Sequence, residues 1–307
     1  CDLLSTKLDA VHVVRESRPY PKDFNQSLFH DEAPLSVCGD ICLPLPDPDL
    51  AVFVLVRHRV ALLGYRMYLD EDGWFHSDET CPSPDRVAFL TENLWRPEIH
   101  FNEHVGFELT QNGGEYRVNR AEKSVHKIEG LVISLTGNEA PNYGSFLFRI
   151  LPKVLEIARL DAGVKILVPM YFPAARQLLL MAGISASRII TQSVDDIYLL
   201  EHVIIPSQRN RDLWLDAESV FLYDSLRLRF GSQQRGRKIY LSRREFQQKS
   251  VAKRVMRGED VLVPQLERRG FEVVEPQKLT AVDQIRLFSS AECILSQSGS
   301  ALFNTVF

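Results

Sequence analysis

The hydrophobic pattern of the chain changes near residue 51. Residues 1–50 are rich in Pro, Asp and Ser and carry few periodic apolar positions, which is typical of irregular structure or an extended arm. Residues 51–76 instead contain short apolar runs of the β type, interrupted by the turn sequence Asp70-Glu71-Asp72-Gly73. We expect a small antiparallel meander there, with strand-like segments at 52–56, 60–63, 65–69 and 74–75.

From about residue 125 the pattern alternates between buried strands and helices. Apolar residues recur at helical spacing over residues 146–158 and again over 174–182. Pro152 should kink the first of these helices or delay its start, because proline has no backbone N–H. The apolar runs between and after the helices predict strands at 130–135, 165–168, 188–190 and 199–205.

A second alternation follows residue 230. Residues 214–230 are predicted to form an amphipathic helix that joins two halves. Arg268-Arg269-Gly270 has the cations and the glycine of a helix end, and Thr280 to Asp283 has the form of a capping box. The segments 238–241, 271–274 and 292–295 are predicted strands, and 301–304 is helix-like.

Two successive βαβ runs imply parallel sheets, each covered by helices. We therefore predict an α/β fold with two Rossmann-like domains that face a cleft, preceded by a β-rich accessory region. The predicted divisions are 1–124, 125–212 and 213–307. Because the chain begins at Cys1 and stops at Phe307 directly after an apolar run, truncation at either end is an open alternative.

Composition narrows the class of protein. The chain has 307 residues, 45% of them hydrophobic and 25% charged, so it can bury a core, and disorder is excluded as its main state. A formal net charge of -4 argues against a nucleic-acid binder that works through a global basic field. No apolar run approaches the roughly 20 residues that span a bilayer.

Cysteine and histidine patterns give little support for a metal site. The five cysteines lack a C-x-x-C pair, so a zinc ribbon is not expected. Cys38 and Cys42 could form a bridge, but an odd, sparse set fits a reducing compartment, which favours a cytoplasmic protein. The D-x-D sequences at 47–49 and 70–72 have a spacing that can hold a cation, but the first lies in a Pro-rich arm and the second in a predicted hairpin turn, and we predict no metal. There is no G-x-S-x-G elbow to indicate a hydrolase.

Three segments at the predicted carboxyl ends of strands carry candidate chemistry, because ligands of such sheets bind there. Residues 295–300 form a strand-to-helix turn whose backbone N–H groups suit a phosphate, with hydroxyls from Ser298 and Ser300. Arg243 and Arg244 follow a strand and could grip a diphosphate. Residues 142–147 could hydrogen-bond a sugar. In each case the alternative is structural: a plain capped turn, a solvated arginine pair or a capped loop.

The order of these segments resembles glycosyltransferase family 61, whose bacterial members are often described as capsular polysaccharide biosynthesis proteins. Residues 142–153 are similar to the family pattern N-Y-x-H-[WF]-L-x-[DE]-x-L-P-R, and residues 238–244 are similar to its strand that ends in S-R. Residues 254–259 resemble its R-x-[IVL]-x-N-E, and residues 270–274 resemble its G-F-x-v-v. Residues 279–291 resemble its L-s-x-x-x-Q-[IV]-x-l-F-s-x-A, and residues 298–304 resemble its H-G-[AS]-[AG]-L-T-N. The similarity covers roughly residues 50–307 and is best after residue 130.

The resemblance implies a GT-B-like pair of domains, inverting transfer from a nucleotide sugar and no obligatory metal or other cofactor. The second domain would bind the donor and the first the acceptor. Carried over by motif, the donor-binding residues are Arg243, Arg244, Ser298, Gly299, Ser300 and Asn304, with Arg254, Glu259 and Gln284 in support. The acceptor side comprises Asn142, Tyr143, Gly144 and Arg149.

Three of the positions that differ from the family motifs could carry chemistry. The histidine of the first motif is Ser145, the acidic residue four positions later is Arg149, and the histidine of the last motif is Ser298. Inverting transfer needs a base for the acceptor hydroxyl, and serine cannot serve without a base of its own. The catalytic base is therefore unassigned, and the candidate residues are Ser145, which would need a base of its own, and Glu139.

These features predict an inverting, metal-independent glycosyltransferase that acts on a glycan or polysaccharide precursor. The alternative is a catalytically impaired relative that binds a nucleotide sugar or a glycan as a partner protein. A sugar-nucleotide epimerase is a third possibility, disfavoured by the absence of G-x-G-x-x-G. A lipid-linked acceptor would place the protein at the inner face of the membrane, and a homodimer is compatible with the sequence.

Overall fold

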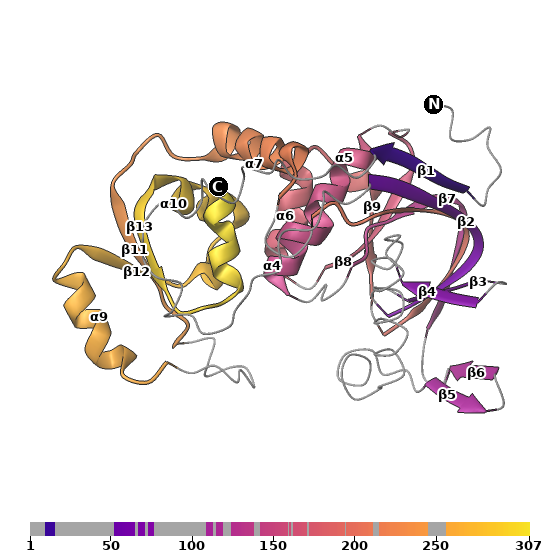
Figure 1. Cartoon of the computed structure of the whole chain (residues 1–307), viewed down its shortest axis with the longest axis horizontal. Helices are drawn as coiled ribbons and strands as arrows, with labels where there is room; N and C mark the ends of the chain where they lie inside the picture. Colours follow the sequence, from indigo (N-terminus) through magenta and orange to yellow (C-terminus); the bar gives the residue numbers. More distant parts are fainter. Residues whose placement is uncertain are drawn as a thin grey trace, which may run out of the picture.

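The computed structural model describes residues 10–15, 52–64, 67–70, 73–76, 109–112, 115–118, 124–137, 142–158, 160, 162–170, 172–193, 195–210, 215–244 and 256–307. Glu139, Arg254 and the D-x-D sequence at 47–49 lie outside these residues, so their predicted roles are not placed. The described part combines strands and helices in the order that the sequence predicts after residue 125 (Figure 1). The mixed α/β class with parallel strands is confirmed.

The first half is built on an eight-stranded sheet with the order β4-β3-β2-β10-β7-β8-β9, to which β1 adds by pairing with β2. Strands β10, β7, β8 and β9 run parallel, whereas β2 is antiparallel to β10. The strands are β1 (Ala10–Arg15), β2 (Val52–Leu63), β3 (Met67–Asp70), β4 (Gly73–His76), β7 (Val125–Ser134), β8 (Lys165–Pro169), β9 (Ile189–Gln192) and β10 (Ile197–Pro206).

The meander predicted over residues 51–76 is present, with two differences. The segments 52–56 and 60–63 are one strand, β2, because the polar residues between them stay in the ladder: His58 lies opposite His202 of β10. The meander is also no separate unit, since β2 hydrogen-bonds along nearly its whole length to β10. The sheet therefore continues across the boundary predicted at residue 124. A small hairpin of β5 (Leu109–Asn112) and β6 (Glu115–Val118) forms a sheet of its own.

The second half contains a three-stranded parallel sheet with the order β12-β11-β13. Its strands are β11 (Arg237–Leu241), β12 (Phe271–Val274) and β13 (Ala291–Ser296), and its helices are α9 (Glu259–Glu267), α10 (Ala281–Ser290) and the 3₁₀ turns η5 (Pro276–Lys278) and η6 (Ser300–Val306). Thr280 caps α10 by accepting a hydrogen bond from the Asp283 N–H, which confirms the predicted start of this helix.

The helical segment after β7 is irregular at Pro152, as expected. It consists of α4 (Tyr143–Ser145), a π-helical turn (Phe146–Ile150), a 3₁₀ turn (Leu151–Lys153) and α5 (Val154–Ile157). Pro152 cannot donate to the Phe148 carbonyl, and the Asn210 side-chain amide donates to it instead, at 2.9 Å. The Leu147 carbonyl, freed by the π turn, accepts from the Tyr223 hydroxyl. Side chains from elsewhere in the chain thus stabilise this kinked segment.

Two further helices complete the described fold. Helix α6 (Pro173–Met181) follows β8 and ends before Gly183, whose φ of +94° suits glycine. After α6, the 3₁₀ turn η4 (Ala186–Arg188) leads into β9. Helix α7 (Ala217–Phe230) connects the two halves (Figure 1). One hydrophobic cluster includes α6, α7, β11 and α10 and so extends through both halves.

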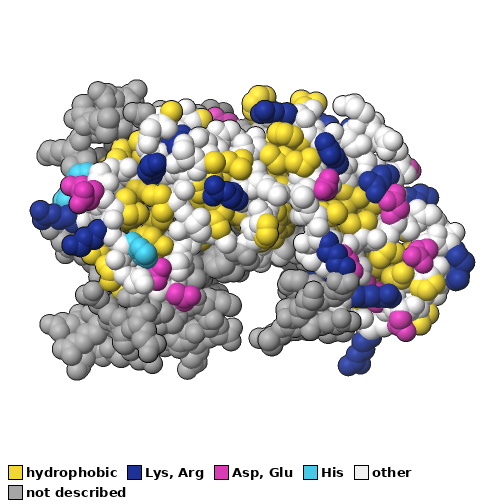
Figure 2. Space-filling view, turned by 180° about the vertical axis from the view of Figure 1, so that it is seen from behind, with side chains coloured by type: hydrophobic (Ala, Val, Ile, Leu, Met, Phe, Trp, Pro, Cys, Tyr) yellow, Lys and Arg dark blue, Asp and Glu magenta, His cyan; other side chains and the backbone are white. Residues whose placement is uncertain are grey.

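The prediction that α7 is amphipathic is wrong. Leu222, Tyr223 and Leu226 are buried, but Phe221 and Leu228 are each 72% exposed on the described surface. Apolar residues thus occupy both sides of the helix, and contacts with the rest of the fold decide which of them are buried. On the face shown in Figure 2, Lys and Arg side chains are scattered among Asp and Glu rather than gathered into one basic patch.

Helix α7 begins at a buried ionic cluster. Asp216 is the N-cap and accepts a hydrogen bond from the Ser219 N–H at 2.7 Å, and its carboxylate lies 3.0 Å from the Arg209 guanidinium. Arg209 also binds Glu156 and Glu218. Burial opposes ionisation of Asp216, but Ser219 and Arg209 outweigh it, and the pKa of Asp216 is lowered.

This lowered pKa predicts acid sensitivity of the linking helix. A carboxyl group whose pKa is lower in the folded state stabilises the fold above its unfolded pKa, near 3.9, and the stabilisation is lost as the pH falls through the folded value. Urea unfolding of the Asp216→Asn variant should therefore show lower stability than wild type at pH 6 and a smaller loss between pH 6 and pH 3. Asp224→Asn, on the exposed side of the same helix, is the control. Parallel loss in wild type and Asp216→Asn would contradict the assignment.

Among the described residues, no helix combines the length and apolarity that a membrane-spanning helix needs.

Candidate functional site

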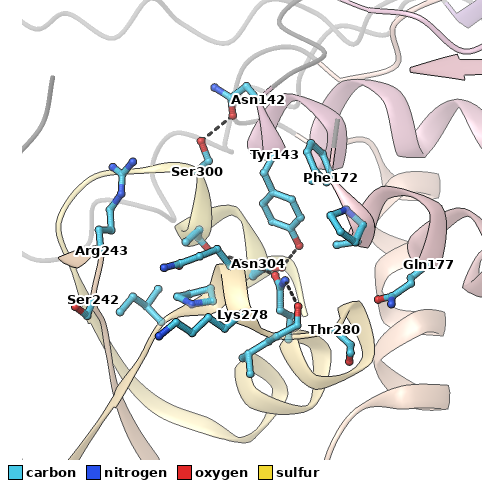
Figure 3. Close-up of a pocket in the computed structure, with 18 residues that line it drawn as sticks. Asn142, Tyr143, Phe172, Gln177, Ser242, Arg243, Lys278, Thr280, Ser300 and Asn304 are labelled. Carbon is cyan, nitrogen blue, oxygen red and sulfur yellow. Dashed lines mark hydrogen bonds between the residues drawn. The ribbon is translucent and has the colours of Figure 1, made fainter. Parts of the chain in front are cut away.

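A cavity of about 530 Å³ lies where the two halves meet, a size that suits a small-molecule ligand (Figure 3). Its walls come from residues that follow strands. Asn142 and Tyr143 come after β7, and Phe172 after β8. Ser242 and Arg243 follow β11, and residues 276–280 follow β12. Residues 300–304 follow β13. The cavity therefore lies at the carboxyl ends of parallel strands of both sheets, where α/β proteins bind ligands.

A chain of hydrogen bonds crosses the cavity wall from one half to the other. The Tyr143 hydroxyl donates to Asn304 Oδ1 at 2.6 Å, and Asn304 Nδ2 donates to Gln284 Oε1 at 2.9 Å (Figure 3). Asn304 is fully buried, and Gln284 Nε2 donates in turn to the Leu279 carbonyl. The hydrogen bond between Tyr143 and Asn304, which are 161 positions apart in the sequence, thus fixes the two walls of the cavity relative to each other.

Tyr143 is not a proton acceptor at neutral pH. Burial raises the pKa of its phenol well above the usual value, against the lowering effect of the hydrogen bond with Asn304. The Tyr143 ring packs edge-on against Phe172, with ring centroids 5.4 Å apart. Tyr143 therefore contributes a fixed aromatic wall and a neutral hydroxyl.

A second bridge joins the halves at the mouth of the cavity. Asn142 is the N-cap of α4, and its Oδ1 accepts a hydrogen bond from the Gly144 N–H. The same oxygen accepts a second hydrogen bond from the Ser300 hydroxyl at 2.7 Å. Gln177 of α6 likewise accepts from the Ala281 N–H at the start of α10. Asn142, Ser300 and Gln177 all line the cavity, so its polar rim is formed jointly by both halves.

Arg243 is the guanidinium that lines the cavity in the described structure. The turn after β13 is adjacent to it: a Cβ atom at Gly299 would lie 3.0 Å from Arg243 Nη1. The turn of residues 298–300 therefore lies next to Arg243. Ser300 lines the cavity, whereas Ser298 and Gly299 are not among the lining residues.

Arg244 is not among the lining residues of the described cavity. Its Nε lies 3.9 Å from Glu259, a buried carboxylate in the first turn of α9. Glu259 accepts hydrogen bonds from Tyr240 and Ser242 at 3.0 and 2.7 Å. Burial and the Glu259 carboxylate raise the pKa of Tyr240 to about 12, so this phenol stays protonated and donates. Glu259 therefore anchors the end of β11 directly before Arg243.

Three further predicted residues, Ser145, Arg149 and Gly144, do not line the described cavity. Ser145 is buried within the helical segment. Gly144 lies against Phe303 of η6, where a Cβ atom would stand 2.7 Å from the ring. Gly144 thus permits close contact between the halves, whereas the family resemblance predicts that it binds the acceptor.

Replacing Gly144 with alanine should weaken the junction. Phe303 is packed edge-on against Phe148, with ring centroids 4.8 Å apart, so a displacement of its ring would disturb this contact. Overpacking of this kind costs about 1–3 kcal/mol of the free energy of unfolding, measurable by urea denaturation. A second change, Phe303→Leu, should restore part of the loss in the double variant. Wild-type stability of Gly144→Ala would contradict the contact.

Sequence reasoning missed Phe172, Gln177, Lys278 and Thr280, which line the cavity. The rule that selected residues 142–147, proximity to the carboxyl end of a strand, would also have selected Phe172 and Lys278. Among the 18 lining residues of the described structure, Arg243 and Lys278 carry charge, and there is no Asp, Glu, His or Cys. The described residues also contain no cluster of three or more possible metal-ligating His, Cys, Asp or Glu side chains.

The described fold and cavity define an α/β protein with a cavity between its two halves, and the charged lining residues are Arg243 and Lys278. The sequence profile of the family described as Glycosyltransferase 61 matches residues 143–307, more than half of the chain. The chain belongs to glycosyltransferase family 61, and the predicted resemblance is confirmed over this range. The match begins at Tyr143 and includes every lining residue except Asn142. Among curated proteins, no sequence matches this chain.

Proposed function

We propose that this protein is an inverting glycosyltransferase that moves a sugar from a nucleotide-sugar donor to a glycan or polysaccharide-precursor acceptor. Family membership supports sugar transfer, and the single observation that carries the donor assignment is Arg243 at the carboxyl end of β11, inside the cavity. A guanidinium can bind a diphosphate through two parallel hydrogen bonds. The proposal includes a GT-B arrangement, with the donor on the second half and the acceptor on the first.

The chemistry assigned to this site is electrostatic. Transfer releases a nucleoside diphosphate, and cations positioned at the leaving group stabilise the charge that develops there. Arg243 supplies such a cation, and the Ser300 hydroxyl lies at the same wall. We propose that the reaction proceeds without a metal, since the described lining offers no carboxylate or imidazole to hold one.

Transfer also needs a base that takes the proton of the acceptor hydroxyl. Tyr143 stays protonated, and the described lining offers no other ordinary base. Glu139 comes three residues before Asn142 in the sequence and remains the candidate that the sequence offers. If no side chain serves, the protein is the impaired relative that binds a nucleotide sugar or glycan as a partner. The serines at 145 and 298 favour this second candidate.

Calorimetric titration of the full chain with UDP-, GDP- and CMP-sugars and the free nucleotides tests the donor assignment. Binding of one nucleotide class is expected, and mass spectrometry of the products would then detect sugar transfer or donor hydrolysis. Nucleotide binding without either reaction favours the partner role. Absence of binding at millimolar ligand by folded protein overturns the proposal. A lipid-linked acceptor, and with it a place at the cytoplasmic face of a membrane, is part of the same proposal.

A further inference from the structure

The outward side of α7 carries apolar side chains that the described fold leaves uncovered. Phe221 and Leu228 are each 72% exposed and Val220 is 44% exposed, although the opposite side of the helix is buried in the core. Phe221 and Leu228 are two helical turns apart, so both project in the same direction, about 10 Å apart along the axis. Figure 2 shows hydrophobic side chains that project at the upper edge of the molecule, where Figure 1 places α7. Large apolar side chains gathered on one exposed face indicate a contact surface.

A charged pair lies between these two apolar side chains. Asp224 comes about one turn after Phe221 and one turn before Leu228, and Arg227 lies on the adjoining flank of the helix. Arg227 Nε and Nη2 both donate to Asp224 Oδ1, at 3.2 and 2.9 Å. Within the described part of the chain, Asp224 Oδ2 and Arg227 Nη1 form no hydrogen bond. One carboxylate oxygen and one guanidinium nitrogen are therefore available to a binding partner.

This arrangement fits a second copy of the chain better than a lipid surface. A carboxylate between the two apolar side chains opposes their insertion into the apolar part of a bilayer. A two-fold pair of copies instead makes each contact twice, because the same face is used by both. In an antiparallel pair with Phe221 against Leu228 of the second copy, the two-fold axis passes beside Asp224. Asp224 Oδ2 then lies within reach of Arg227 Nη1 of the second copy, and the four charges balance.

We propose that two copies of this protein associate through the outward face of α7, as an antiparallel pair with Phe221 of each copy against Leu228 of the other. A 14-residue helix presents a face about 21 Å long and about 10 Å wide. This face is small against the roughly 800 Å² that each partner of a stable complex buries, so the association is weak and depends on concentration. Urea unfolding at low micromolar concentration measures the monomer, in which Asp224 and Arg227 form an ordinary surface pair. The inference does not depend on sugar transfer or on the ligand of the cavity.

Sedimentation equilibrium of the full chain between about 5 and 500 µM tests the proposal. The average mass of wild type should rise with concentration toward that of two chains. Phe221→Glu should raise the dissociation constant by more than about tenfold, because it places a charge without a partner at the centre of the contact. Val261→Glu is the matched control, since Val261 is 61% exposed on α9 of the second half. Circular dichroism checks that each variant is folded.

Charge reversal tests the antiparallel arrangement. Asp224→Arg gathers four cations at the contact and should abolish the association over the same range of concentration. The double variant Asp224→Arg/Arg227→Asp forms the pairs again with opposite sign and should recover most of the wild-type affinity. A double variant that associates no better than the single one would contradict the charge pairing between copies.

Three outcomes would overturn the proposal. The first is a wild type that stays monomeric at the highest concentration, and the second is an equal effect of Phe221→Glu and Val261→Glu. The third comes from co-sedimentation with vesicles of phosphatidylcholine and phosphatidylglycerol: binding by a monomeric wild type that Phe221→Glu abolishes would assign this face of α7 to a lipid surface. Nucleotide-sugar binding is measured separately, so failure of the proposed function would leave the association through α7 in place.

Discussion

Replacement of Arg209 by leucine is expected to lower the free energy of unfolding by about 3–5 kcal/mol, the largest stability effect that the structure predicts. Arg209 is 2% exposed, and its guanidinium is surrounded by the carboxylates of Glu156, Asp216 and Glu218. Glu156 and Asp216 are buried as well. Without the arginine, two buried carboxylates would have to stay ionised without their cation or take up protons. Equilibrium urea unfolding, followed by circular dichroism, measures the loss.

The matched control for this prediction is Arg227→Leu. Arg227 lies 2.9 Å from Asp224 on the exposed side of α7, and such surface pairs contribute about 0–1 kcal/mol. If Arg209→Leu does not fold, Arg209→Lys keeps a charge and should give a measurable intermediate stability. The double variant Arg209→Leu/Glu156→Leu should be more stable than the single one, because one uncompensated carboxylate is removed. Equal losses at Arg209 and Arg227 would contradict the assigned role of the cluster.

Replacement of Arg243 by alanine is expected to weaken binding of the nucleotide-sugar donor by more than about tenfold, the largest functional effect. Arg243 is the guanidinium of the described cavity wall, and charge-assisted hydrogen bonds to phosphate are among the strong ones. Arg243→Lys should recover only part of the affinity, because an ammonium cannot reproduce the two parallel hydrogen bonds of a guanidinium. Calorimetric titration with the donor, once its nucleotide class is known, gives the ratio.

The Arg244→Ala variant tests the loss of donor affinity predicted from the structure against the loss predicted from the sequence pattern. The paired arginines predict similar losses at both positions, whereas the structure predicts a much smaller loss at Arg244, whose guanidinium faces Glu259. The folded state of each variant should be checked by thermal unfolding, since Gly299 and the turn of residues 298–300 pack close to Arg243. Unchanged donor affinity in a folded Arg243→Ala variant would remove Arg243 from the site.

The contrast between Arg243 and Arg244 shows how much of the candidate site can be predicted from the sequence. A strand that ends in Leu241-Ser242-Arg243-Arg244 places two cations near a ligand, but periodicity does not say which one faces it. The choice is made by Glu259, whose buried carboxylate binds Tyr240 and Ser242 and attracts Arg244. The sequence does not indicate Lys278, for a related reason. It has no motif, and it joins the site only because β12 lies beside β11.

The sequence by itself determined the alternation of strands and helices after residue 125, the start of α10 at Thr280, the disturbance at Pro152 and the family. These features depend on local periodicity, capping and short motifs, which are written in neighbouring residues. Only the tertiary structure decided that β2 is one strand paired with β10, that both sides of α7 carry apolar residues, and that Tyr143 meets Asn304 across the cavity. Those outcomes depend on contacts between residues far apart in the chain, and burial and charge neutralisation at such contacts are properties of the packed fold rather than of any one segment.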